Sequence, residues 1–262
     1  SCRIMPVKVL DAKGDGYDSD IAQGIIWAVQ KGAKVINMSL GGPGTSKALN
    51  DAVAYANMNS VLVVAAAGNH GGTARMYPAA LTDVVAVGAT ARCPNFSTDP
   101  QCTTGTNSLD TYSGRNSSSD RWVDVAAPGN VVAMDTRGNY STGQTIGTSF
   151  ASPIVAGIAG LVKSQHPDFT GWELMNAVQR SAVGRAVAGT TYGKVDAAAA
   201  LNVPTETVPP TSSGISPAQG SYVKGTFAVK PVGIADNYSG IRNVTLYVDG
   251  VYKGYSRTAP FS

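Results

Sequence analysis

Ser149 lies in a segment whose residue types can place a hydroxyl at the start of a buried helix, Gly147-Thr-Ser-Phe-Ala-Ser-Pro153. An apolar stretch over residues 154–161 follows at once and predicts that helix. Its unpaired backbone N–H groups and positive dipole end favour a developing negative charge. Pro153 falls near the predicted first turn, where a missing N–H is best tolerated. Taken alone, the segment favours a simpler role for Ser149 or Thr148 as the helix N-cap.

Asn69 is the second residue that can do chemistry. It follows a continuous apolar run over residues 61–67, which predicts a strand buried on both faces. Asn69 then lies just beyond the carboxyl end of that strand, at the edge where open α/β sheets place their sites. A side-chain amide there can donate a hydrogen bond to an oxyanion. Taken alone, the position of Asn69 among glycines favours a simpler role as a turn residue.

The elements that would hold these two residues alternate between strand and helix. Asp18 or Ser19 is the predicted N-cap of the first helix. The alternation predicts an α/β fold with a mainly parallel sheet layered by helices. Strands are predicted over 3–10, 35–38, 61–67, 84–87, 123–126, 131–134 and 142–146, and helices over 18–32, 47–58, 149–165, 171–180 and 195–201.

Five segments in order resemble the subtilisin-like serine proteases. GTSFASP at 147–153 is similar to the nucleophile motif of that family, and AAAGN at 65–69 to the strand that ends in its oxyanion Asn. The others are Asn37-Met-Ser-Leu-Gly-Gly42, similar to the substrate-binding edge strand, Met76-Tyr-Pro78, similar to a turn that is often cis, and Ala127-Pro-Gly129. The resemblance covers residues 3–202 and implies a three-layer domain, truncated at its N-terminus.

The resemblance implies a serine endopeptidase that forms an acyl-enzyme on Ser149 and acts on polypeptides. Asn69 and the backbone N–H of Ser149 would hold the oxyanion, and Met76 would lie near the base of an apolar pocket that takes large apolar side chains. The residues flanking an extended substrate would be Ser39, Leu40, Gly41, Ala66, Ala67 and Gly68. The chemistry needs no cofactor. Structural calcium is common in the family, but no site is placed.

The family's general base and orienting acid, in the order Asp, His, Ser, are expected upstream of this chain. His70 lies in a glycine loop and His166 at a helix end before Pro167, which favours structural roles for both. The chain alone is therefore expected to be inactive. The alternative is a scaffold on a degenerate protease fold that binds peptides without cutting. An α/β-hydrolase is disfavoured because Gly-x-Ser-x-Gly does not surround Ser149.

Composition changes after residue 202. Residues 1–202 form the predicted catalytic domain and 203–215 a Pro/Thr/Ser linker. Residues 216–262 alternate in period two around Asp249-Gly250, a hairpin turn signal, and predict a partial immunoglobulin-like β-sandwich.

Bulk properties exclude several classes of protein. With 43% hydrophobic and 14% charged residues the chain is not disordered. Its net charge of +3 is scattered, which argues against nucleic-acid binding, and no apolar run is long enough to span a membrane. Cys93 and Cys102 bracket a short polar loop and are expected to form a disulfide, with two free thiols as the alternative, and Cys2 is left over. We expect a secreted or cell-surface monomer.

Overall fold

The computed structural model describes residues 2–90, 108–134, 137–140, 145–203, 211–218, 221, 222, 224, 229–235, 244–248 and 251–256. The chain divides into two units, Ser1–Val203 and Pro204–Ser262, and each is described by itself.

A five-stranded parallel sheet forms the centre of the first unit, as the strand–helix alternation predicts. Its strands lie side by side in chain order, and the pairs include Val35↔Leu62, Val63↔Val84 and Val87↔Val125. Parallel neighbours in this order place their carboxyl ends at one edge of the sheet. The strands are β1 (Val35–Met38), β2 (Leu62–Ala66), β3 (Val84–Thr90), β4 (Val125–Pro128) and β7 (Gly193–Lys194).

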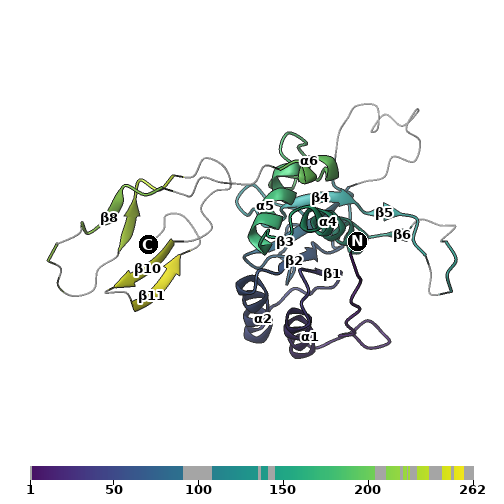
Figure 1. Cartoon of the computed structure of the whole chain (residues 1–262). Coiled ribbons are helices and arrows are strands. Elements are labelled where there is room, and N and C mark those ends of the chain that lie inside the picture. The colour runs from purple at the N-terminus through teal and green to yellow at the C-terminus, as the bar shows by residue number, and fades with distance from the viewer. Residues whose placement is uncertain are drawn as a thin grey trace. The chain divides into compact units, whose positions relative to one another are not determined.

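Helices cover both faces of this sheet (Figure 1). Leu62 and Val64 of β2 pack with α4 (Thr148–Gln165), α5 (Gly171–Ser181) and α6 (Ala197–Leu201). Val63 and Ala65 point the other way, into a cluster with α1 (Asp18–Gln30) and α2 (Lys47–Met58). Because successive side chains of a strand alternate between faces, a strand covered on both sides must be apolar throughout. This is a three-layer α/β fold around a parallel sheet, as the sequence predicts.

Side-chain caps fix the start of two of the longer helices. Ser46 accepts a hydrogen bond from the backbone N–H of Leu49 at the start of α2. At α5, Thr170 and Glu173 form a reciprocal capping box. The predicted caps of α1 are wrong: its N-cap is Tyr17, without a side-chain bond, and Asp18 is already helical. An acidic residue in the first turn still interacts favourably with the helix dipole.

Pro153 lies deeper in α4 than the sequence predicts. The helix begins at Thr148, so Pro153 is its sixth residue rather than part of the first turn. Only the first four N–H groups of a helix lack an intrahelical partner. Pro153 therefore removes a hydrogen bond that the helix would otherwise form.

The strand predicted over 3–10 is absent, which corrects the prediction. Residues 2–9 have no regular structure, and residues 2–8 are exposed. Val9 instead packs against α1, where a Cβ built on Gly24 would lie 2.4 Å from Val9 Cγ1. A strand needs a neighbour for its backbone hydrogen bonds. The apolar pattern of residues 3–10 is typical of a buried strand, but it does not supply that neighbour.

The later strands are short and displaced from their predicted positions. The prediction over 123–126 corresponds to β4, and those over 131–134 and 142–146 correspond to an antiparallel pair, β5 (Asn130–Val131) and β6 (Thr145–Ile146). Residues 142–144 lie outside the described part of the chain. The two residues of β7 carry no apolar pattern, which is why the sequence does not predict that strand.

The described residues of the second unit form two antiparallel strand pairs. One joins β8 (Gly214–Ser216) to β9 (Lys230–Val232), and the other joins β10 (Val244–Val248) to β11 (Val251–Ser256). The immunoglobulin-like sandwich stays a prediction. In the part of the chain that the structure describes, no helix has the length and apolarity needed to cross a bilayer.

Replacing Leu174 by alanine is expected to lower the free energy of unfolding by about 2–5 kcal/mol. Its side chain is fully buried between α5 and the sheet, so truncation leaves a cavity as well as losing apolar contact. Leu161→Ala is the matched control, because Leu161 is 51% exposed on α4 and should cost less than about 0.5 kcal/mol. Chemical denaturation measures both. Equal losses would contradict the packing described here.

Candidate functional site

Ser149 and Ser39 meet where the carboxyl end of β1 faces the N-terminus of α4. The hydroxyl of Ser39 donates to the backbone carbonyl of Ser149 at 2.7 Å. The hydroxyl of Ser149 donates in return to the backbone carbonyl of Ser39, at a longer 3.4 Å. The side chain of Ser149 is therefore at the sheet edge, on the second residue of α4, and its hydroxyl is held weakly by the long hydrogen bond to Ser39.

Asn69 is held next to the start of α4 by Thr148, the residue before Ser149. Its Oδ1 accepts two hydrogen bonds from Thr148, from the backbone N–H at 2.9 Å and from Oγ1 at 2.8 Å. Oγ1 of Thr148 in turn accepts from the N–H of Gly68 at 3.1 Å. With Oδ1 occupied by two donors, the amide orientation is fixed and Nδ2 is the group available to an acceptor. Asn69 is exposed, so a ligand can reach it.

Gly147 allows the backbone to pass close to this amide. Its φ is 153°, in a region that side-chain-bearing residues rarely adopt, and a Cβ there would lie 3.3 Å from Asn69 Nδ2. Its N–H donates to the carbonyl of Gly129 at 2.9 Å. The glycine thus turns the chain into α4 without placing a side chain of its own against Asn69 Nδ2.

The segments predicted to bind substrate lie along the same edge. Ser39 and Gly41 are exposed and Leu40 is partly buried, whereas Ala66 and Ala67 are buried and Gly68 is partly exposed. The structure therefore brings Ser39, Ser149 and Asn69 together. It leaves Ala66 and Ala67 buried in the core, so Gly68 is the residue of this segment that is partly exposed at the site.

Met76 lies beneath Gly68. A Cβ on Gly68 would come within 2.8 Å of Met76 Cγ, and Met76 is only 8% exposed. The next peptide bond, Tyr77-Pro78, is cis, as the turn motif predicts. Tyr77 pairs through its backbone with Gly42 at 2.8 and 2.9 Å, which ties this turn to the end of the Ser39–Gly42 segment.

An ion pair that the sequence does not predict braces the loop after Asn69. Arg75 binds Asp120 through two hydrogen bonds of 2.8 and 2.6 Å, and the pairing lowers the pKa of the Asp120 carboxyl. Trp122 Nε1 donates to the carbonyl of Thr73 within the same loop at 3.2 Å. The partners lie 45 residues apart and follow no recognisable motif, so no sequence signal finds them.

Asp124 is a buried carboxyl group that sequence analysis also misses. One carboxyl oxygen accepts from the N–H of Ala86 at 2.8 Å and the other from Gln179 Nε2 at 3.3 Å. Burial raises the pKa of this carboxyl to about 7, although the two hydrogen bonds oppose the shift. Asp124 directly precedes β4 and joins β3 to α5, at the end of β4 opposite its carboxyl end. It therefore bears on stability rather than on the chemistry at Ser149.

The two histidines are not positioned as partners of Ser149. His70 is exposed in the loop after Asn69. His166 ends α4 and stacks on Phe169 with ring centroids 4.4 Å apart. It follows Ser149 by a helix of about 25 Å, the length expected from a rise of 1.5 Å per residue. No hydrogen bond between either histidine and Ser149 occurs among the described residues.

Three further expectations bear on the site. Cys93 and Cys102 lie outside the described residues, and Cys2 is exposed and free. In the described ranges, no three His, Cys, Asp or Glu side chains are grouped to hold a metal ion. Calcium binding stays a prediction without a site.

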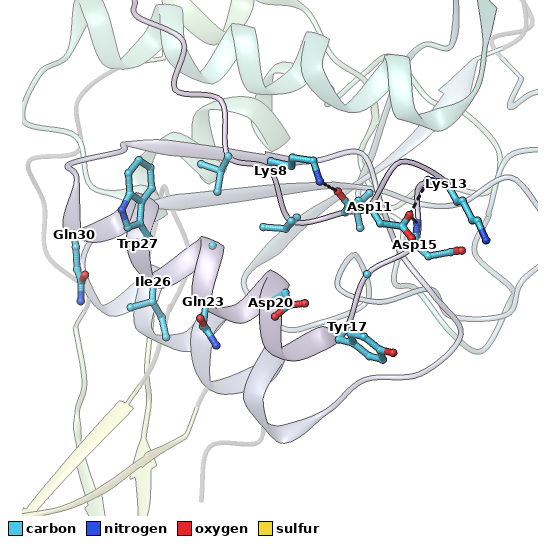
Figure 2. Close-up of a pocket in the computed structure, with 15 residues that line it drawn as sticks. Lys8, Asp11, Lys13, Asp15, Tyr17, Asp20, Gln23, Ile26, Trp27 and Gln30 are labelled. Atoms are coloured by element: carbon cyan, nitrogen blue, oxygen red, sulfur yellow. Dashed lines mark hydrogen bonds between the residues drawn. The ribbon is translucent and has the colours of Figure 1, made fainter.

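A cavity of about 1000 Å³ lies elsewhere, between residues 7–17 and α1 (Figure 2). Figure 2 shows Trp27, Ile26 and Gln23 contributed by α1. Asp11 on its opposite wall is already satisfied by the N–H groups of Lys13 and Asp15. The lining contains neither Ser149 nor Asn69, so this groove has no part in the candidate site.

Comparisons with known proteins show which family the chain is similar to. The model of the subtilase family matches residues 1–211. M-protease of Shouchella clausii (strain KSM-K16) is 38% identical over 184 residues, 70% of this chain and 44% of the relative. Subtilisin BL of Lederbergia lenta is 37% identical over 182 residues, 70% of this chain and 61% of the relative. The solved S41 psychrophilic protease aligns with a TM-score of 0.61 and 33% identity, over 71% of this chain and 62% of that one.

These relatives extend beyond the matched region: the chain spans 44% of the first and 61% of the second. The family match nevertheless covers most of the chain, and it includes Ser39, Asn69 and Ser149. The chain therefore belongs to the subtilase family.

Proposed function

We propose that the protein is a serine endopeptidase in which Ser149 is the nucleophile and Asn69 an oxyanion donor. The observation that carries the proposal is the pair of hydrogen bonds from Thr148 to Asn69 Oδ1. They leave Nδ2 as the donor that this amide can offer to a ligand, and Ser149 is the residue directly after Thr148. An N-cap or a turn residue would need no such preorganised amide.

The chemistry follows from this arrangement. Oγ of Ser149 attacks the carbonyl carbon of a peptide bond, and its proton passes to a general base. Asn69 Nδ2 and the backbone N–H of Ser149 hold the oxyanion, at the positive end of the α4 dipole. The carbon–nitrogen bond then breaks, the amine leaves with a proton, and water hydrolyses the ester on Ser149.

The general base is proposed to lie outside this chain. His70 and His166 are not bonded to Ser149, and the family order Asp, His, Ser places both partners before the residues seen here. A nucleophile without its base loses most of its activation. The chain alone is therefore proposed to be inactive, and the natural polypeptide that contains it to be the enzyme.

The substrate is proposed to be an extended polypeptide. Residues 39–41 and 66–68 lie at the carboxyl ends of β1 and β2 and border the site, and their backbone groups are proposed to pair with a substrate as an added strand. Met76 under Gly68 supplies an apolar floor, which favours large apolar side chains before the cut.

The test uses the longest natural polypeptide that contains this chain, with any propeptide removed. It is incubated with denatured casein and with a fluorogenic peptide, before and after treatment with a fluorophosphonate. We expect cleavage that the fluorophosphonate abolishes. Peptide binding without cleavage by the folded protein would overturn the proposal in favour of a non-cutting scaffold.

A further inference from the structure

Pro153 leaves the carbonyl of Ser149 without its regular helical partner. In an α-helix the carbonyl of residue 149 accepts from the N–H of residue 153. Proline has no N–H, and its ring also crowds the carbonyl four residues earlier. Because α4 begins at Thr148, this carbonyl lies inside the helix and belongs to the candidate nucleophile itself.

The hydroxyl of Ser39 takes the place of that missing N–H. It donates to the carbonyl of Ser149 at 2.7 Å, a favourable distance for a hydroxyl donor. Ser39 directly follows β1, on a segment 110 residues from Ser149 in the chain. The bond therefore joins the substrate-binding segment to the backbone of the nucleophile.

Two further side chains fix the direction of this bond. Ser152 is fully buried, and its hydroxyl donates to Asn37 Oδ1 at 2.6 Å. Nδ2 of Asn37 donates to Oγ of Ser39 at 3.1 Å. Each side chain thus donates one hydrogen bond to the next, from Ser152 to Asn37 and from Asn37 to Ser39. Oγ of Ser39 accepts from Asn37 and directs its own proton at the carbonyl of Ser149. A reversed Asn37 amide would draw that proton away from the carbonyl.

We propose that Ser39 is a positioning residue for the nucleophile, filling through its hydroxyl the hydrogen bond that Pro153 leaves open, with Asn37 and Ser152 orienting it. The inference rests on the proposed function, since it concerns how Ser149 is held for attack. It adds that a substrate pairing with residues 39–41 covers this bond and excludes water from it. The bond is then stronger in the complex than in the free protein.

The experiment is a double-mutant cycle of Ser39→Ala and Pro153→Ala, in the longest natural polypeptide that contains this chain. Ser39→Ala alone should lower kcat for a peptide substrate about tenfold, with KM changed less than about twofold. Ser39→Thr keeps the hydroxyl and should restore kcat to within about twofold of wild type. In the Pro153→Ala background residue 153 has its own N–H, so Ser39→Ala should then cost less than about twofold.

Thr170→Ala is the control, because it removes the capping box of α5, beside the start of β2 and away from the site. It should lower stability without changing kcat. The same loss from Ser39→Ala in both backgrounds, or no loss in either, would overturn the inference. Activity that persists in Ser149→Ala would instead overturn the proposed function, so the two failures are distinguishable.

Discussion

Replacing Asn69 by alanine is expected to lower kcat by about 10²–10³-fold while KM changes by less than about twofold. The size is that known for this donor in a subtilisin, and it is carried over from the family. The direction follows from the structure, because Thr148 occupies Oδ1 and leaves Nδ2 for a charge that develops only in the transition state. Steady-state kinetics on one peptide substrate measure both constants.

Asn59→Ala is the matched control for this variant. Asn59 caps the end of α2, and its Nδ2 donates to the carbonyl of Tyr55 at 2.8 Å. Asn59→Ala removes the same side-chain amide at a position away from Ser149, and it should leave kcat unchanged. A loss below about tenfold for Asn69→Ala, or a loss confined to KM, would show that the amide binds substrate without stabilising the oxyanion.

Replacing Asp124 by asparagine is expected to raise the free energy of unfolding by about 4 kcal/mol at pH 7–8 and by almost nothing near pH 4. Burial raises the pKa of this carboxyl from 3.8 to about 7. Across that window the folded protein keeps a proton that the unfolded chain releases, so wild-type stability falls as pH rises. Asparagine keeps the bond from Ala86 and has no charge to bury, but its Nδ2 replaces the oxygen that accepts from Gln179 Nε2, so Gln179 must present its Oε1 instead. Denaturation at several pH values measures the difference.

Asp120→Asn should change the free energy of unfolding in the opposite direction. Arg75 lowers the pKa of Asp120, so this carboxylate stabilises the fold above its unfolded pKa, and the contribution disappears as pH falls. The variant should be less stable than wild type at pH 7, with the difference vanishing in acid. A pH-independent effect of Asp124→Asn would contradict the account.

The sequence predicts the elements that bury an apolar pattern and misses those that depend on a distant partner. The pattern of residues 61–67 is apolar throughout and predicts β2, and the period of residues 47–58 predicts α2. Residues 3–10 carry the same kind of signal but form no strand, because a strand requires a neighbour as well as a pattern. The pattern alone is enough to predict β2 and α2. Residues 3–10 lack the paired neighbours that β2 has in β1 and β3.

The candidate site shows the same division. Ser149 and Asn69 come from local motifs at a helix start and a strand end, and the structure brings them together through Thr148. The carboxyl of Asp124 and the bond from Ser39 to Ser149 join segments far apart in the chain. No spacing in the sequence reports such contacts. Pro153 is visible in the sequence, but its consequence depends on where α4 begins.

The most direct test of the central claim is to label the longest natural polypeptide that contains this chain with a fluorophosphonate and to locate the adduct by peptide mass spectrometry. A serine activated for attack reacts, whereas an ordinary helix-capping serine does not. The account predicts one modified residue, Ser149, and no labelling in Ser149→Ala. An unmodified Ser149 in the folded wild-type protein, or an adduct on another serine that persists in Ser149→Ala, would contradict it.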